Sequence, residues 1–184
     1  MEREEALALI REHVKGEFLF KHMLATEAIM KEVALFLGED AGMWSLAGLL
    51  HDIDFEETKD DVKRHGVLAE RYIAGKVPEE VVRAINAHAS EYNGTPAPSN
   101  KMEIALLSAD AITGLIVAAA LVKQDKKLSS VTVDSIRNAF KKKGFAAGSN
   151  RSNIKRIEEI GIPLDKFFEL SLTAMQRIAP QLGL

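Results

Sequence analysis

The chain has 184 residues, of which 47% are hydrophobic and 28% are charged, and its formal net charge is −3. This length suits a single domain with a sizeable hydrophobic core. Because cysteine is absent, disulfides, thiolate metal sites and cysteine nucleophiles are excluded. The longest apolar run, residues 111–122, is shorter than the roughly 20 residues of a membrane-spanning helix, and residues 1–12 lack the pattern of a signal peptide. We therefore expect a cytoplasmic protein that does not bind a membrane.

Charge is distributed unevenly along the chain. Residues 1–122 carry 12 basic and 21 acidic groups, whereas residues 123–156 carry 10 basic and 2 acidic groups. A partner that is a nucleic-acid polymer is not expected, because binding one needs a broadly basic surface. A local basic segment suits a small anionic ligand better.

Hydrophobic residues recur at helical spacing in nearly every segment. In chain order, this pattern predicts helices over residues 2–13, 20–37, 41–51, 61–74, a helix beginning at Pro78, and then 100–123, 132–143, 152–160 and 163–179. Residues 54–61 and 124–130 are predicted connections, and residues 90–99, which contain Asn-Gly and two prolines, are the clearest loop. Gly144 is expected to end the helix before it. We therefore predict an all-α, single-domain bundle of eight to ten helices.

Six side chains of metal-ligand type recur along these helices. The pair His51-Asp52 ends the most apolar predicted helix, and four more lie on either side of it: His22, His65, His88 and Asp110. The gaps between successive members are 28, 12, 22 and 21 residues, so helices that fold back on each other can bring all six together. Imidazole and carboxylate together suit a divalent transition metal. Adjacent helical side chains diverge by about 100°, so His51 and Asp52 can share a metal only where the helix ends or bends.

The order H…HD…H…H…D resembles the HD superfamily of metal-dependent phosphohydrolases, of the HDIG-like type, over about residues 18–122. The resemblance rests on five short sequence motifs: Lys21-His22, Gly48-Leu-Leu-His51-Asp52-Ile53, Arg64-His65-Gly66, Ile85-Asn-Ala-His88 and Ser108-Ala109-Asp110. The resemblance implies an HD core in this range, with residues 123–184 as a C-terminal helical elaboration of the same domain.

By this resemblance, His22, His51, Asp52 and Asp110 bind one metal ion, while His65 and His88 hold a second ion that Asp52 bridges to the first. HD proteins with one metal also exist, so one or two ions of Fe, Mn, Zn, Co, Ni or Mg are consistent with the sequence. The implied reaction is attack of a metal-activated water on phosphorus in a small phosphorylated metabolite or a nucleotide. The alternatives are a di-iron HD oxygenase and a non-catalytic module that senses a nucleotide. The sequence leaves self-association open.

Three further residues are candidates for roles at this site. Related enzymes often place a catalytic acid three residues beyond the HD aspartate, where this chain has Phe55. Asp54 or Glu56 could instead orient the water or protonate the leaving group, or both could lie in a solvated loop. Thr113 lies one helical turn after Asp110 and could contact the substrate, or its hydroxyl could bond its own backbone.

The segment from Lys141 to Arg151 is a second candidate site. It joins a lysine-rich helix end to a glycine-containing turn, and Ser149 or Asn150 can cap the helix that follows. We expect Arg151, with Lys143 or a neighbouring lysine, to face the metal cleft and bind phosphate oxygens. The alternative is a basic hairpin that is exposed to solvent.

Overall fold

The computed structural model describes all residues from 1 to 184, and they form helices and loops without strands. The twelve α-helical segments, eight of which exceed four residues, confirm the all-α prediction. They are α1 (Arg3–His13), α2 (Glu17–Leu37), α3 (Ala41–Leu50), α4 (Phe55–Thr58), α5 (Glu70–Ile73), α6 (Glu79–His88), α7 (Ser90–Asn93), α8 (Lys101–Leu121), α9 (Val133–Lys141), α10 (Arg151–Lys155), α11 (Leu164–Arg177) and α12 (Ala179–Leu182). Three 3-10 segments join them: η1 (Val62–Arg64), η2 (Leu128–Ser130) and η3 (Arg156–Ile160).

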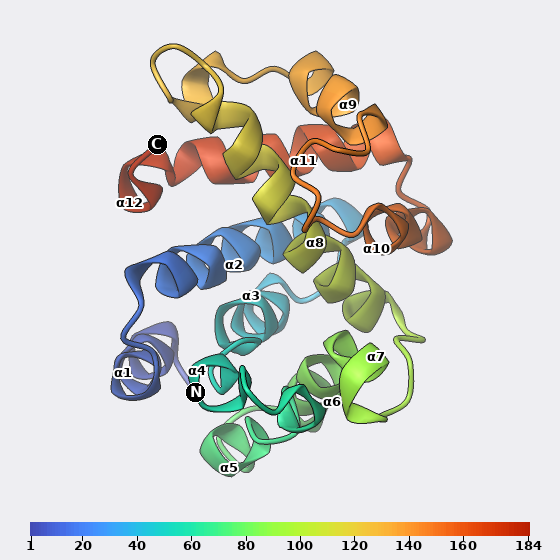
Figure 1. Cartoon of the computed structure of the whole chain (residues 1–184). Coiled ribbons are helices and arrows are strands. Elements are labelled where there is room, and N and C mark those ends of the chain that lie inside the picture. Colours follow the sequence, from blue (N-terminus) through green and yellow to red (C-terminus); the bar gives the residue numbers. More distant parts are fainter.

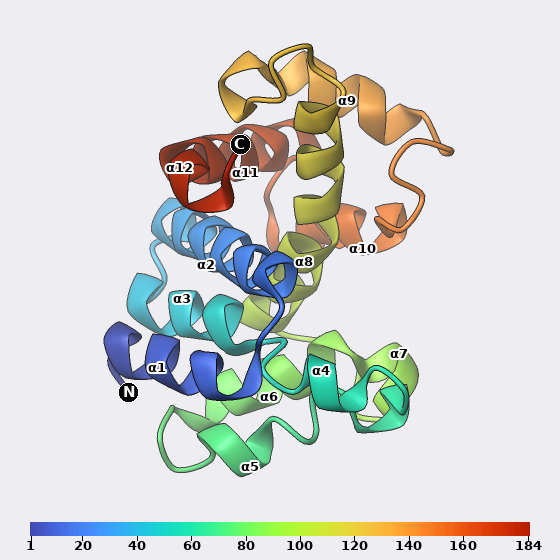
Figure 2. The same cartoon turned by 60° about the vertical axis from the view of Figure 1, so that its left-hand side comes forward.

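Helix α2 lies at the centre of the molecule, between α3 on one side and α11 on the other (Figure 1). Helix α8 crosses α2 and extends from the α6 and α7 end of the molecule to the α9 end (Figure 2). A cluster of 43 buried hydrophobic residues, from Ala6 to Leu182, is continuous through these layers. The C-terminal helices therefore share a core with the segment that contains the HD pair.

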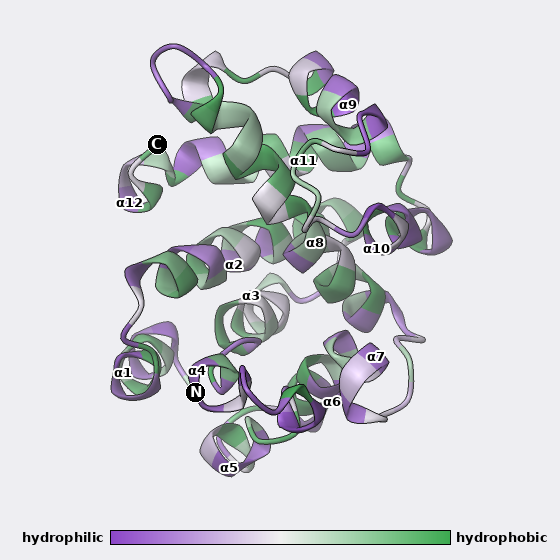
Figure 3. Ribbon diagram, viewed as in Figure 1, coloured by the Kyte–Doolittle hydropathy of each residue, from purple (hydrophilic) through white to green (hydrophobic).

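Helices α3 and α8 are the most hydrophobic elements, as Figure 3 shows. By length and composition alone, α8 is apolar enough to cross a membrane, but 67% of its most apolar window is buried inside the protein. This burial is typical of a central helix in a folded core. Helix α8 begins with an Asn100 cap, in which Asn100 and Glu103 bond each other's backbone amides.

The α2–α3 crossing is close because Gly48 lacks a side chain. A Cβ atom at Gly48 would lie 2.8 Å from the carbonyl oxygen of Thr26 and 2.9 Å from the backbone nitrogen of Glu27. This close approach sets the first turns of α2 beside the end of α3. It therefore positions two of the predicted metal ligands, His22 and His51, next to each other.

The predicted helix over residues 61–74 is wrong, because the chain breaks in its middle. After η1, His65 adopts an extended conformation with ψ 135°, and Gly66 has φ +79°. A side chain at Gly66 would be strained in that conformation, and its Cβ would lie 2.8 Å from the carbonyl oxygen of Ile85. The helical pattern resumes only at the short α5.

Other boundaries also differ from the sequence-based expectation. The segments predicted as connection and loop contain the one-turn helices α4 and α7, and the predicted helix 152–160 divides into α10 and η3. Gly144 does not end α9 in a left-handed conformation; the helix stops at Lys141, Lys142 is extended, and Ala146 has the positive φ of 44°. Pro78 caps α6, close to the predicted start of that helix.

Candidate metal centre

His51 is the C-cap of α3, and Asp52 lies in the turn that follows it. The helix therefore ends where the sequence required it to end if both side chains were to reach one point. Both residues are buried, as are the other site histidines except His22, which is partly buried. The apolar run of α3 thus delivers two polar side chains into the interior.

The first group of ligand atoms surrounds one oxygen of Asp52. His22 Nε2 lies 3.1 Å from His51 Nε2 and 3.1 Å from Asp110 Oδ1. Asp52 Oδ2 is 3.5 Å from His22 Nε2 and 3.4 Å from His51 Nε2. Helices α2, α3 and α8 and the turn after α3 contribute to this group.

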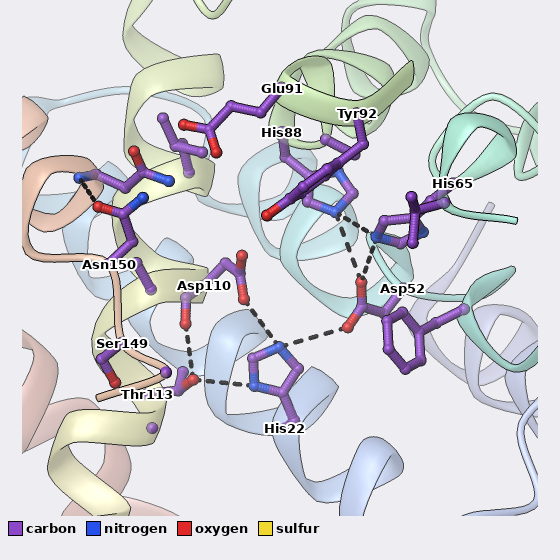
Figure 4. A pocket seen from close by; sticks show the side chains of 18 of the residues that line it. His22, Asp52, His65, His88, Glu91, Tyr92, Asp110, Thr113, Ser149 and Asn150 are labelled. Atoms are coloured by element: carbon purple, nitrogen blue, oxygen red, sulfur yellow. Dashed lines mark hydrogen bonds and ion pairs between the residues drawn. The ribbon is translucent and has the colours of Figure 1, made fainter. Parts of the chain in front are cut away.

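The second group surrounds the other oxygen of the same carboxylate. Asp52 Oδ1 lies 3.3 Å from His65 Nε2 and 3.5 Å from His88 Nε2, and those two nitrogens are 3.2 Å apart. Figure 4 shows Asp52 between His22 on one side and His65 with His88 on the other. The six predicted ligands therefore converge as two groups that share Asp52.

These distances fit divalent metal ions. Nitrogen and oxygen ligands about 2.0–2.1 Å from one ion at tetrahedral or octahedral angles lie about 2.8–3.4 Å from each other. Two sets of three side chains offer donors close enough to hold an ion: His22, His51 and Asp52, and Asp52, His65 and His88. Asp110 Oδ1 adjoins the first set, 3.1 Å from His22 Nε2 and 3.9 Å from His51 Nε2.

The four histidines are also held in the orientation that metal binding needs. The Nδ1 atom of each ring has a hydrogen-bond partner on the side away from the centre: the carbonyls of Gly48 for His51 and of Ile85 for His88, the carboxylate of Asp54 for His65, and Thr113 for His22. The Thr113 hydroxyl donates to the carbonyl oxygen of Asp110 and so accepts from His22. With Nδ1 engaged as a donor, each neutral ring presents the lone pair of Nε2 to the centre.

Without a metal ion, the opposing charges of the centre shift the pKa values of its groups. Burial lowers the pKa of His51 to about 4. Burial also disfavours charged His65, but hydrogen bonds to Asp52 and Asp54 outweigh it and raise the pKa of His65 to about 10. Burial similarly opposes ionised Asp52, yet the surrounding histidines hold the pKa of Asp52 well below its usual value. The carboxylate that joins the two groups is therefore ionised at neutral pH.

Asp54, Glu56 and Thr113 all make hydrogen bonds to other parts of the protein. Asp54 is fully buried; one oxygen bonds His65 Nδ1 at 2.9 Å and the other accepts from the backbone nitrogen of Ala69 at 3.0 Å. Glu56 points to the α1–α2 connection, where its Oε1 accepts from the backbone nitrogens of Lys15 and Gly16. Asp54 and Glu56 thus make structural contacts and do not line the pocket, and a catalytic role for either stays a prediction. Thr113 orients His22 and also lines the pocket, so its contact with substrate stays a prediction.

The expectation for Arg151 and Lys143 is corrected, because neither side chain lines the pocket over the metal centre. The guanidinium of Arg151 donates to the carbonyl oxygens of Ala146 and Ser149 at 2.6 and 2.7 Å and also to that of Phe145. Arg151 therefore ties together the loop before α10 and does not reach into the cleft. The predicted cap is confirmed: Asn150 accepts from the backbone nitrogens of Ser152 and Asn153.

The metal centre forms the floor of a pocket of about 660 Å³. Its remaining walls include three aromatic side chains, Phe18, Phe55 and Tyr92, three neutral polar residues, Ser149, Asn150 and Asn153, and one acidic residue, Glu91, but neither lysine nor arginine. Sequence reasoning missed the aromatic residues because single aromatic side chains in loops and helix ends carry no recognisable spacing. The segment around Ser149 was identified, although its polar and not its basic residues face the pocket.

An all-α fold with two histidine groups bridged by the aspartate of an HD pair defines a helical metal-binding protein. The HD domain family matches residues 19–134, more than half of the chain, and the protein therefore belongs to this family. The chain is also similar to Ribonuclease Y of Desulfotalea psychrophila, with 33% identity over 101 residues. The match covers 54% of this chain but 18% of that ribonuclease, so the chain spans a small part of its length.

Proposed function

We propose that this protein is a metal-dependent phosphohydrolase that acts on a small phosphorylated molecule in the cytoplasm. The observation that carries the proposal is the arrangement of four histidine Nε2 atoms around the two oxygens of Asp52 at the floor of an open pocket. Divalent ions bound there would acidify a water molecule and stabilise negative charge on phosphoryl oxygens. HD domain family members generally catalyse such metal-dependent hydrolysis.

The pocket walls supply neutral hydrogen-bond donors for such a substrate. The Oδ1 atom of Asn150 is engaged in capping α10, so the cap fixes the amide orientation and leaves Nδ2 free to donate. Asn150 and Ser149 lie across the pocket from Asp52 (Figure 4). We infer that they bind substrate oxygens while the residues of the centre hold the ions.

A small substrate fits this pocket better than a polymer. The similar protein from Desulfotalea psychrophila is named a ribonuclease. Proteins that hold a nucleic-acid backbone neutralise successive phosphates with lysine and arginine. This pocket has neither among its lining residues, so its positive charge would come from the bound ions alone. We therefore extend to this chain the phosphoryl chemistry and not the polymeric substrate.

Metal analysis of purified variants, combined with a panel of phosphomonoesters and phosphodiesters, tests the proposal. We expect two equivalents of metal in the unmodified protein, about one in His88→Ala, and neither ion retained in Asp52→Ala, because Asp52 belongs to both groups. His13→Ala is the matched control, since His13 stacks on Tyr72 outside the centre. Metal-loaded protein that cleaves no phosphate ester would refute the function, and oxygen consumption by an iron-loaded protein would identify an oxygenase instead.

A further inference from the structure

A second cavity, of about 350 Å³, adjoins the pocket over the metal centre. The two share five lining residues, which are Phe18, His22, Thr113, Gly114 and Ala118. The second cavity, here called the apolar groove, therefore lies directly beside the pocket, on the side of His22 and Thr113. It runs between the start of α2, the second half of α8 and the end of the chain.

The walls of the apolar groove are almost entirely hydrocarbon. Beyond the shared residues it is lined by Lys21 and by Ala25, Val117, Leu121, Leu182 and Leu184. The Thr113 hydroxyl is bonded to His22 Nδ1, and His22 Nε2 faces the metal centre. Lys21 is the one charged side chain, and its aliphatic stem can cover apolar surface while the ammonium stays in water. The groove thus offers contact area but few partners for a polar ligand.

Exposed apolar side chains gather around these two cavities. Nine large hydrophobic residues are exposed in the whole protein. Five of them line the pocket or the groove, namely Phe18, Phe55, Val62, Tyr92 and Leu121. Phe18, which borders both cavities, is 81% exposed. Clustered exposure of this kind is typical of binding surfaces, ligand grooves among them.

We propose that the substrate is a phosphate ester of an aliphatic alcohol, with its phosphate at the metal centre and its hydrocarbon chain in the apolar groove. This inference rests on the proposed function. A nucleobase is a poorer occupant, because it needs hydrogen-bond partners along its edge and the groove walls do not supply them. From Gly114 to Leu121 the wall formed by α8 is about 10 Å long, since each helical residue rises 1.5 Å.

The chemistry is an ordinary ester hydrolysis. The oxygen of water forms a bond to phosphorus, the bond from phosphorus to the alcohol oxygen breaks, and that oxygen takes a proton. The products are inorganic phosphate and the free alcohol, so no oxidant or reductant is required.

Alkylphosphonates test the groove without turnover, because their carbon–phosphorus bond is not hydrolysed. We expect calorimetry with metal-loaded protein to show affinity rising from methyl- through butyl- to octylphosphonate. A fully buried methylene contributes about 0.8 kcal/mol, which corresponds to about a fourfold gain per methylene as an upper value. In metal-free protein, octan-1-ol should shift the NMR methyl signals of Val117, Leu121, Leu182 and Leu184, which line the groove.

Ala118→Trp places a large side chain where the groove meets the pocket, and we expect it to abolish the dependence of affinity on chain length. Leu121→Glu tests the far end of the groove with a charge. Leu35→Trp is the matched control, because Leu35 is 59% exposed on α2 and lines neither cavity. Leu35→Trp should keep the chain-length dependence of the unmodified protein.

These experiments distinguish failure of the inference about the apolar groove from failure of the proposed phosphohydrolase function. Equal affinity for all three phosphonates, or a chain-length dependence that survives both Ala118→Trp and Leu121→Glu, overturns the inference. Hydrolysis of short phosphate esters without any preference for longer chains also overturns it, but leaves the phosphohydrolase intact. Chain-length dependence in a protein that hydrolyses no phosphate ester supports the apolar groove and refutes the proposed function.

Discussion

Each of the four site histidines is held at Nδ1 by a different residue, and only two of these holders are side chains. Gly48 and Ile85 act through backbone carbonyls that point mutation does not remove, whereas Asp54 and Thr113 act through groups that it does. Mutation of Asp54 or Thr113 can therefore remove the hydrogen bond that orients His65 or His22 without changing any metal ligand.

Replacing Thr113 with valine should weaken metal binding at the His22 group. The change removes the acceptor for His22 Nδ1 while keeping the shape of the side chain, and loss of such a partner typically costs 10–100-fold in metal affinity. Competition with a chromophoric chelator measures the effect. Ser171→Ala is the control, because its buried hydroxyl has no partner and lies on α11. Unchanged affinity in Thr113→Val would show that Thr113 does not orient the ring.

Metal binding at the His65 group should release a proton at neutral pH. Asp52 and Asp54 raise the pKa of His65 from 6.5 to about 10, so the metal-free protein holds a proton that an ion must displace. Affinity should therefore increase with pH up to about 10. The protonated ring contributes stability to the metal-free fold in full below pH 6.5, and this contribution is lost as the pH rises through about 10.

Calorimetry in buffers of different ionisation enthalpy counts the released protons. Asp54→Asn should lower the pKa of His65, so proton release on metal binding should disappear at a lower pH than in the unmodified protein. Proton release with the same pH dependence in the two proteins would contradict the role assigned to Asp54.

At the scale of elements, the crossing of α2 and α3 depends on one glycine. Gly48→Ala would press a Cβ against the backbone of Thr26 and Glu27, and overpacking of this kind costs about 1–3 kcal/mol in the free energy of unfolding. Urea titration measures the loss. Gly42→Ala, in the first turn of the same helix, should change stability by less than about 1 kcal/mol. Equal effects of the two substitutions would show that the crossing is not tight.

The loop before α10 is the second element whose order depends on one side chain. Removing the Arg151 guanidinium takes one donor from each of three backbone carbonyls, and we expect Arg151→Ala to lower the free energy of unfolding by about 1–3 kcal/mol. Hydrogen exchange of the amides of residues 144–150 should accelerate. Lys143→Ala, an exposed neighbour, should leave that exchange unchanged. An unaffected loop in Arg151→Ala would contradict the structural role.

The elements that sequence predicted best are those with a long apolar face, such as α2, α3 and α8. Residues 61–74 have helical spacing too, yet the chain breaks there, because Gly66 must pass close to Ile85 and His65 must turn toward Asp52. These tertiary contacts override a local pattern. Gly66 was the one visible sign of the break.

The order of the ligand residues sufficed to predict that six distant side chains meet. Their holders could not be predicted in the same way, since Asp54 and Thr113 gain their roles from rings that approach them from other helices. For Arg151 the sequence-based expectation was wrong: its charge suggested an anionic ligand, but its guanidinium donates to backbone carbonyls of its own loop and of α9. Net charge along a segment does not specify which way each side chain points.

At the scale of the whole molecule, residues beyond the matched family segment belong to the same core. Phe167, Phe168 and Met175 of α11 are buried in the single cluster, and α11 packs along α2. A chain truncated after residue 134 should therefore lose the cooperative unfolding transition of the full chain. Circular dichroism and tryptophan fluorescence of Trp44 should report coincident transitions only for the full chain. A truncated chain that unfolds cooperatively would define residues 1–134 as an independent domain.

Helix α8 has a consequence for how the substrate range of such a protein can evolve. In one turn of this helix, Asp110 and Thr113 both contact His22 at the metal centre. Further along the same helix, the pocket or the groove is lined by Gly114, Val117, Ala118 and Leu121. Point substitutions in the later turns can reshape the groove while Asp110 keeps its place. An inserted or deleted residue between them would rotate one set against the other by about 100°. We therefore expect related proteins to differ in the side chains of these later turns of α8 but not in the number of residues between them and Asp110.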